Sequence, residues 1–356
     1  MPGHDIIVIG ASAGGVEALT SLVKRLPEDL PAAVFAVLHI SPESPSRLPE
    51  ILSRAGNLPA TQARHGEEIR PGHIYVAAPD RHLLVHKGHI GVVHGPKENH
   101  YRPAVDTLFR SAARWYGPRV VGVVLTGALD DGTAGLIDIK ERGGLAVVQD
   151  PNEALFPSMP TSAIQYCDVD YVLPLSGIPA MLVELANSPA EDEGGYPVSD
   201  RLDLEVRIVE GLDSHPEVLD RLGTPSYYTC PECHGTLWEM RESELPRFRC
   251  RTGHVYSAES MLAEHNISVE AALWAAVRSL EESTTLSRRL AAQALKRNHL
   301  IVERKFTSKA DETERQANVI RQLLFTRPEN TEQPDLTAIG RPDGARSIGH
   351  QQTPID

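Results

Sequence analysis

The sequence predicts an α/β fold, built on a mostly parallel sheet with helices on both faces, followed by a small cysteine-bearing module and a helical segment. Three observations support this. In the first half, short continuous apolar segments alternate with amphipathic helical patterns, which is typical of parallel strands that are buried on both faces. Residues 226–262 then contain three of the four cysteines, and residues 263–325 show a long, charged helical pattern.

The elements of the first half follow from their hydrophobic periodicity. Strands are predicted at residues 6–9, 34–38, 74–77, 120–125, 146–149 and 171–173. Helices are predicted at residues 16–25, 103–115, 133–142, 159–165 and 178–186. A hairpin, residues 82–85 and 90–93 joined around Lys87-Gly88, interrupts the alternation.

Shifts in composition divide the chain into five parts. Residues 1–187 form the sheet-containing domain, and residues 188–225, rich in Pro, Gly, Ser and acidic residues at their start, are predicted to be a linker. The cysteine module, 226–262, and the helical segment, 263–325, follow. In residues 326–356, Pro, Gly, Gln and Thr dominate without periodicity, which predicts a disordered tail.

Composition excludes several classes of function. The net charge of −13 over 356 residues argues against a nucleic-acid partner, because phosphate binding needs a basic face. No apolar run is long enough to cross a bilayer, so no membrane insertion is expected. The chain starts directly with a strand, which predicts no signal peptide, and cysteines without a disulfide framework suit the reducing cytoplasm. Cys167, outside the cluster, is expected to be a buried small residue.

The first predicted strand runs into a Gly-x-Ser-x-Gly turn, Gly10 to Gly14, and then into a helix. Such a turn exposes the Ser12 hydroxyl above the sheet, at a helix N-terminus whose free N–H groups can hold an oxyanion. A phosphate or dinucleotide site and a plain tight turn are the alternatives. The dinucleotide fingerprint is incomplete, because Ser12 replaces its middle glycine and the second strand ends in His39 rather than in an acidic residue.

A serine nucleophile needs a base and an orienting carboxylate. His39 ends the second predicted strand, and Asp130-Asp131 follow the strand at 120–125, so all three residue types stand at the same edge of a parallel sheet. A structural histidine, and carboxylates that merely cap the next helix, are the alternatives.

Residues 5–186 resemble the catalytic domain of the CheB-type protein-glutamate methylesterases. The resemblance rests on separate motifs that occur in the family's order: IGASAGG (9–15), LH (38–39), PGHIYVA (71–77), HGP (94–96), RPAVDTLF (102–109), LTG (125–127), DG (131–132) and FPSMP (156–160).

This resemblance implies a Rossmann-like three-layer fold and a serine hydrolase that needs no cofactor for catalysis. By its motifs the nucleophile is Ser12, the base His39 and the acid Asp131, because the family's aspartate directly precedes a glycine. The backbone N–H groups of Ala13 and Ala128 are the implied oxyanion donors. The implied substrates are methylated or amidated glutamyl side chains of chemoreceptors or related sensory proteins.

The sequence also departs from the family pattern. Ala13 stands where many members have Thr, and Ala128-Leu129 where Met-Gly is common. Members usually carry an N-terminal phosphoreceiver domain, whereas this chain starts at the catalytic strand, so a different regulation is expected. The rival hypothesis is a non-catalytic adaptor that uses the hydrolase domain as a binding scaffold. The presence of Ser12, His39 and Asp131 together argues against it.

The cysteine module carries two paired turns, Cys230-Pro-Glu-Cys233 and Cys250-Arg-Thr-Gly-His254. Three cysteines and a histidine at this spacing predict a tetrahedral structural zinc site in a ribbon of short strands. So short a module cannot bury enough surface to fold without such support. His234 is the rival fourth ligand, and free thiols or a redox pair are the alternative to zinc.

In the helical segment, apolar residues share one face while charged residues cover the rest, which predicts a helical hairpin or coiled coil. The face consists of Leu273, Ala276, Val277, Leu280, Leu286 and Leu290. The helices are expected to dock on the ribbon, to dimerise or to bind a partner helix. The plain alternative is a solvated helix that only packs on its own ribbon.

Overall fold

The computed structural model describes residues 3–43, 45–213, 216–241 and 245–326. The chain divides into two compact units, Met1–Ile267 and Ser268–Asp356. No helix in these described ranges is both long and apolar enough to cross a membrane. The tail predicted to be disordered lies outside the described residues from position 327 onward.

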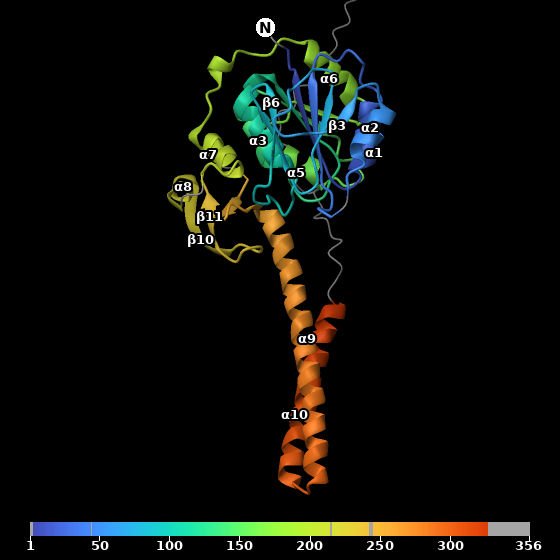
Figure 1. Ribbon diagram of the computed structural model, residues 1–356, viewed down its shortest axis with the longest axis vertical. Coiled ribbons are helices and arrows are strands. Elements are labelled where there is room, and N and C mark those ends of the chain that lie inside the picture. Colours follow the sequence, from blue (N-terminus) through green and yellow to red (C-terminus); the bar gives the residue numbers. More distant parts are fainter. Residues whose placement is uncertain (1–2, 44, 214–215, 242–244, 327–356) are drawn as a thin grey trace, which may run out of the picture. The chain divides into compact units, whose positions relative to one another are not determined.

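The first unit is built on a seven-stranded sheet in which every described neighbouring pair is parallel (Figure 1). In spatial order its strands are β3 (Ala60–Gln62), β4 (Ile74–Val76), β2 (Ala33–Leu38), β1 (Ile6–Ala11), β7 (Val120–Val124), β8 (Leu145–Gln149) and β9 (Tyr171–Leu173). The central strands β1, β2 and β7 are buried along their whole length, as their continuous apolar sequences predict.

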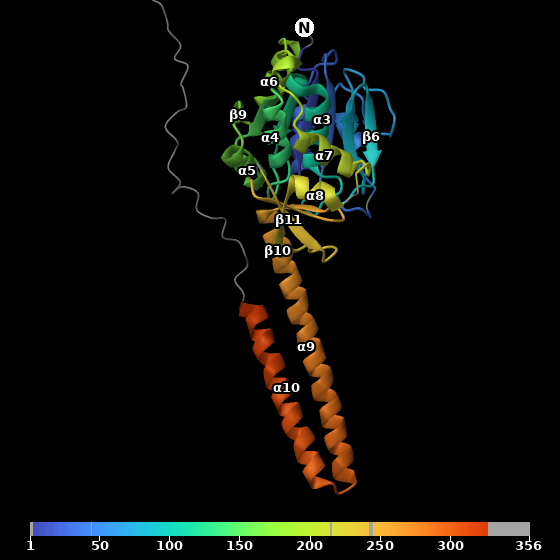
Figure 2. The ribbon, with the colours of Figure 1, turned by 90° about the vertical axis from the view of Figure 1, so that its left-hand side faces the viewer.

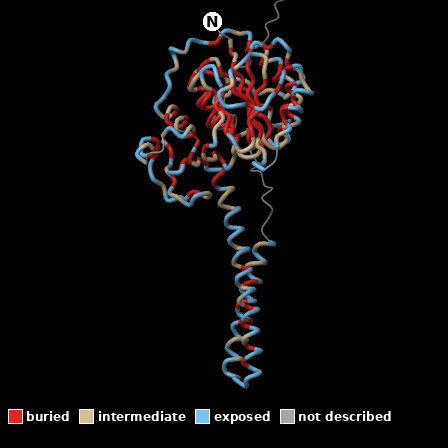
Figure 3. Tube along the Cα trace, viewed as in Figure 1, coloured by how far each residue is buried: buried red, intermediate tan, exposed pale blue. Residues whose placement is uncertain are grey.

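Helices cover both faces of this sheet, so the predicted three-layer α/β fold is confirmed (Figure 3). One face packs against α1 (Gly15–Val23), α2 (Leu48–Ala55) and α6 (Ile178–Asn187). The other packs against α3 (Val105–Tyr116), α4 (Thr133–Glu141) and α5 (Ser158–Tyr166). The 3-10 turn η1 (Gly117–Arg119) leads from α3 into β7. The predicted hairpin is also present, as β5 (His82–His86) and β6 (His89–Val93).

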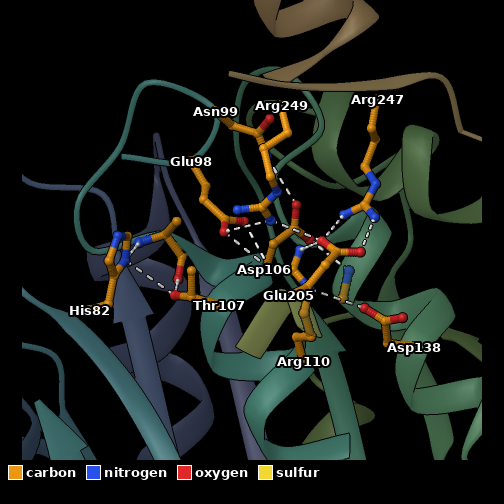
Figure 4. Close-up of polar contacts among 12 residues, drawn as sticks. His82, Glu98, Asn99, Asp106, Thr107, Arg110, Asp138, Glu205, Arg247 and Arg249 are labelled. Carbon is orange, nitrogen blue, oxygen red and sulfur yellow. Dashed lines mark hydrogen bonds and ion pairs between the residues drawn. The ribbon is translucent and has the colours of Figure 1, made fainter. Parts of the chain in front are cut away.

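The segment predicted to be a linker, 188–225, contains two helices. They are α7 (Asp200–Val209) and α8 (Pro216–Leu222), preceded by the short turn η2 (Glu193–Gly195). Ser199 starts α7 by accepting a hydrogen bond from the Leu202 N–H at 3.2 Å. Glu205 of α7 is fully buried and is paired with buried arginines, so this helix is an integral part of the unit (Figure 4).

The cysteine module forms a four-stranded antiparallel sheet within the first unit. Its strands are β10 (Gly223–Thr229), β11 (Thr236–Met240), β12 (Arg247–Cys250) and β13 (Val255–Ser257). A small core of Leu237, Phe248, Tyr256 and Met261 surrounds Cys230 and Cys250. We call residues 226–262 the ribbon below.

The second unit is an antiparallel helical hairpin (Figure 2). Helix α9 (Ala258–Lys296) begins in the first unit and continues through the second, and α10 (Leu300–Thr326) returns beside it. Small side chains lie between the two helices: Thr284 and Thr313 share a hydrogen bond of 2.7 Å, and Ala310 and Ala317 are buried. The predicted helical hairpin is therefore present.

Candidate active site

Ser12 occupies a sharp turn between β1 and α1. Its N–H donates to the Thr126 carbonyl at 3.0 Å, which ties the turn to the end of the neighbouring strand β7. Gly14 has φ 74°, a left-handed conformation that favours glycine and that directs the chain into α1. The Ser12 hydroxyl therefore stands at the carboxyl edge of the sheet, as the sequence predicts.

The sheet order β2-β1-β7 brings His39 and Asp131 to the same edge. His39 follows β2, and its Nδ1 lies 3.0 Å from the Ser12 Oγ. Its Nε2 lies 2.7 Å from Oδ2 of Asp131, in the loop between β7 and α4. A hydroxyl, an imidazole and a carboxylate thus form one continuous hydrogen-bonded relay, the arrangement that activates a serine nucleophile.

The structure distinguishes between the two adjacent carboxylates. Asp131 is buried and accepts hydrogen bonds from the N–H groups of Val105 at 2.7 Å and Asp106 at 3.2 Å. Burial alone would raise the pKa of Asp131, but the hydrogen bonds from His39 and these donors hold it below its usual value. Asp130 instead accepts from the Ser257 hydroxyl, and burial raises its pKa to about 7. Asp131 is therefore the ionised partner of His39.

Two side chains that the sequence did not single out support the relay. The Tyr101 ring stacks on the His39 imidazole, with centroids 3.6 Å apart and an interplanar angle of 6°. Asn99 donates from Nδ2 to Oδ1 of Asp131 at 3.1 Å. Both belong to the loop between β6 and α3. A cleft of about 500 Å³ opens beside this loop and is lined by residues that include Ser12, His39, Tyr101 and Arg102.

The proposed oxyanion donors lie next to the serine turn. Among the described residues, the N–H groups of Ala13 and Ala128 find no hydrogen-bond acceptor, so both are free to bind a developing negative charge. The absence of a side chain at Gly127 lets the loop after β7 approach Ser12 and Met159 closely. A Cβ at that position would lie 2.8 Å from Cβ of Ser12 and 2.0 Å from the sulfur of the buried Met159.

Asp106 has a structural role at the same edge. It is buried, and its Oδ1 accepts the N–H groups of Gly132 at 3.0 Å and Gly135 at 2.7 Å, at the start of α4. Burial and the nearby Asp131 charge raise its pKa well above the usual value.

Comparison with known proteins identifies the family. The sequence model of the family described as CheB methylesterase matches residues 7–182. A relative from Leptospira interrogans, which bears the name protein-glutamate methylesterase/protein-glutamine glutaminase, is 41% identical over 189 residues, or 53% of this chain and 98% of the relative. This chain belongs to the CheB methylesterase family.

Other CheB relatives are longer than the matched region. A protein-glutamate methylesterase/protein-glutamine glutaminase from Anaeromyxobacter dehalogenans is 39% identical over 181 residues, which are 51% of this chain and 53% of that protein. The CheB methylesterase catalytic domain of Thermotoga maritima superposes with a TM-score of 0.50 at 35% identity and covers 52% of this chain and 100% of that domain. The match is therefore confined to the CheB catalytic domain, and the ribbon and helical hairpin lie outside it.

In the ribbon, beyond the CheB match, the four predicted metal ligands converge. The candidate ligand atoms of Cys230, Cys233, Cys250 and His254 all lie within 4.8 Å of one another. The Sγ atoms of Cys233 and Cys250 are 3.6 Å apart, and Nδ1 of His254 is 3.6 Å from Cys230 and 3.5 Å from Cys250. A tetrahedral zinc ion with Zn–S bonds of about 2.3 Å separates its ligand atoms by about 3.8 Å, so the cluster fits such an ion.

The surroundings of the cluster also suit a metal. The Nε2 of His254 lies 2.9 Å from a Glu232 carboxylate oxygen, which leaves Nδ1 free to coordinate. His234, the rival ligand, is exposed and is not a member of the cluster. Cys167 is half-buried against the core, and burial raises its pKa to about 12.

Proposed function

We propose that this chain is a serine hydrolase that demethylates glutamyl side chains of a chemoreceptor or related sensory protein, and that also deamidates glutaminyl side chains. The observation that carries the proposal is the Ser12–His39–Asp131 relay at the sheet edge of a CheB-family domain. The relatives' names supply the substrate class. The relay supplies the chemistry through this chain's own residues, without a cofactor.

Acylation starts at Ser12. His39 Nδ1 takes the hydroxyl proton while the Ser12 Oγ attacks the γ-carbonyl carbon of the methylated glutamate. The carbonyl oxygen becomes an oxyanion, which the free N–H groups of Ala13 and Ala128 stabilise. Asp131 stabilises the imidazolium through Nε2. As the carbon–oxygen bond to the methoxy group breaks, His39 returns the proton and methanol leaves.

Deacylation repeats these steps with water. His39 removes a proton from a water molecule, the resulting hydroxide attacks the glutamyl ester on Ser12, and the Ser12 oxygen leaves and recovers the proton. The product is a glutamate carboxylate. With a glutaminyl side chain, ammonia takes the place of methanol as the leaving group.

Methanol release from methylated chemoreceptor membranes tests the proposal, by comparing the full chain with Ser12→Ala. We expect release by the full chain and a loss of at least about 10³-fold in the variant. Release at the same rate from Ser12→Ala would contradict the assignment of the nucleophile. The adaptor alternative predicts that both proteins bind the receptor and that neither releases methanol.

The four converging ribbon ligands support a structural zinc ion rather than a catalytic one. Cys230, Cys233, Cys250 and His254 fill all four positions of a tetrahedral site, so no position remains for water or substrate. We expect one zinc per chain by elemental analysis. Absence of bound metal from protein that was purified without chelator and shown to be folded would contradict this assignment.

The helical hairpin is the proposed site of partner binding or self-association. Apolar side chains that remain exposed along it are Val269, Trp274, Leu286, Leu295, Leu300, Ile301, Val302, Val319, Leu323 and Phe325. None of the four cysteines forms a disulfide, which suits a reducing compartment, and we propose that the reaction takes place in the cytoplasm. The mass of the full chain in solution tests self-association directly.

A further inference from the structure

We infer that Asn99 is a positioning residue through which the ribbon holds Asp131 and His39 in place, so that the reactivity of Ser12 depends on a folded, metal-loaded ribbon. The inference rests on the proposed role of Ser12 as the nucleophile. It links the matched CheB domain, which contains Asn99 and Asp131, to the ribbon outside the match, and it gives the ribbon a function in the reaction.

One buried side chain touches both the catalytic acid and the ribbon. Asn99 is 3% exposed. Its Nδ2 donates to Asp131 at 3.1 Å and to Asp106 at 3.0 Å. Its Oδ1 accepts the Ser257 N–H at 3.0 Å and the Ser260 hydroxyl at 3.1 Å. Because the donor side faces the two carboxyl groups and the acceptor side faces the ribbon, the amide has a single favourable orientation.

The backbone of the same loop pairs with the last strand of the ribbon. The Asn99 N–H donates to the Val255 carbonyl at 2.8 Å, and the Val255 N–H donates to the Lys97 carbonyl at 3.3 Å. Val255 directly follows the candidate ligand His254. A shift of His254 on loss of the metal would therefore move Val255, and with it the loop between β6 and α3 that carries Asn99 and Tyr101.

A second connection runs through charged groups. Lys97 donates to Glu232 at 2.6 Å, and Glu232 also pairs with His254 at 2.9 Å. The next residue of the loop, Glu98, is buried and forms an ion pair of 3.5 Å with Arg249. Arg249 directly precedes the candidate ligand Cys250. The Glu98–Arg249 pair is buried and therefore costly to break, so it couples the position of the loop to that of the neighbouring ligand Cys250.

The turn that carries Asn99 is closed by two backbone hydrogen bonds between Glu98 and Tyr101, of 3.2 and 2.9 Å, and the ribbon adds the contacts described above. Asn99 has φ 49° and His100 has φ 73°, and two consecutive non-glycine residues in the left-handed region store backbone strain. Tyr101, which stacks on His39, follows immediately. Release of the ribbon would let this segment relax, and both the Asn99 donor and the Tyr101 ring would move away from the relay.

The test uses the full chain and the rate at which a fluorophosphonate probe labels Ser12, which needs no receptor substrate. Asn99→Ala should lower the labelling rate, and kcat for methanol release, by about 10- to 100-fold, because misplacing a catalytic group by about 1 Å costs this much. The KM should stay within about threefold, because Asn99 is buried and does not line the cleft. Ser260→Ala should show a smaller loss in the same direction.

Ser226→Ala is the matched control. Its hydroxyl also lies in the ribbon and donates to a nearby carbonyl, that of Leu237 at 2.8 Å, but among the described residues it forms no hydrogen bond with the loop between β6 and α3. We expect labelling at the parent rate. The fraction of molecules labelled at long times reports folded protein, and a lower rate with complete labelling separates mispositioning from misfolding.

Metal removal tests the coupling itself. Stripping the parent protein with a chelator should slow labelling to about the rate of Asn99→Ala, and added zinc should restore it. The same treatment should slow Asn99→Ala much less, because the side-chain link from the ribbon to Asp131 is already cut and only the backbone and charged contacts of the loop remain. Parent-rate labelling by Asn99→Ala, or equal slowing of both proteins by the chelator, would overturn the inference. Labelling of Ser12 without methanol release would instead count against the proposed substrate and leave the coupling testable.

Discussion

Replacing Asp131 by Asn is the sharpest test of which carboxylate serves His39. Both oxygens of Asp131 already accept two donors each: Oδ2 accepts His39 Nε2 and the Val105 N–H, and Oδ1 accepts the Asp106 N–H and Asn99. An asparagine carries an NH₂ group in place of one of these oxygens. In either orientation this NH₂ group faces a backbone N–H that needs an acceptor.

Two effects follow, one on the rate and one on stability. With its NH₂ toward His39, the amide forces the imidazole into the tautomer whose Nδ1 carries the proton and cannot accept one from Ser12. With its NH₂ turned away, the charge that stabilises the imidazolium is still lost. We expect kcat to fall about 10⁴-fold, which is about 5 kcal/mol of transition-state stabilisation. One buried N–H without an acceptor costs about 1–3 kcal/mol of folding stability.

The assay measures methanol release and urea unfolding on the same preparations. Asp130→Asn is the matched control, because it makes the same chemical change one residue away, and its amide oxygen can still accept the Ser257 hydroxyl. We expect the control to lose less than about tenfold in kcat, since no contact joins Asp130 to His39 among the described residues. A kcat for Asp131→Asn within tenfold of the parent, or a larger loss for Asp130→Asn, would refute the reasoning.

Three further predictions concern stability and packing. The pKa of Asp130 is about 7 in the folded protein, above its value in the unfolded chain, so the parent protein loses folding stability as Asp130 ionises between about pH 4 and pH 7. Asparagine stays neutral, so Asp130→Asn should raise Tm relative to the parent more at pH 8 than at pH 5. An equal difference in Tm at both pH values would contradict this. Gly127→Ala places a Cβ 2.0 Å from the Met159 sulfur, so we expect a loss of about 1–3 kcal/mol in urea unfolding together with reduced kcat, and parent-like values for both would be inconsistent with the close approach. Cys233→Ser should abolish stoichiometric zinc binding and lower Tm, whereas Cys167→Ser should keep the zinc, as elemental analysis and thermal unfolding would show; retained zinc in Cys233→Ser would exclude this ligand set.

The convergence of Ser12, His39 and Asp131 could be predicted from sequence, because the three residues stand at the ends of easily recognised strands. The apolar sequences of β1, β2 and β7 are continuous, and parallel strands bring their carboxyl ends to one edge. The position of each side chain relative to its strand then places Ser12, His39 and Asp131 together.

Short or partly exposed elements were missed for physical reasons. Strand β3 has three residues, of which only Ala60 is buried, so it gives no apolar run. Helix α7 was hidden inside the predicted linker, because its buried Glu205 has the appearance of a solvent-facing charge in sequence. That charge is buried only because arginines from α3 and the ribbon surround it, and such contacts have no local signature.

Asn99 shows the same limit within the site. Its ribbon partner Ser257 is 158 residues away in sequence, so nothing around Asn99 indicates that it joins the ribbon to Asp131. The convergence of Cys230, Cys233, Cys250 and His254 could be predicted from their spacing, but the place where the ribbon packs on the first domain could not. Tyr101 was likewise missed, because stacking on His39 depends on the course of a loop.

The central claim is that Ser12, His39 and Asp131 act as one catalytic unit. The most direct measurement compares methanol release by Ser12→Ala, His39→Gln and the double variant. When the residues act as a unit, removing a second one costs little, so the double variant should match the slower single variant within about threefold. Losses that multiply in the double variant would show that the two side chains act independently, and would contradict the relay.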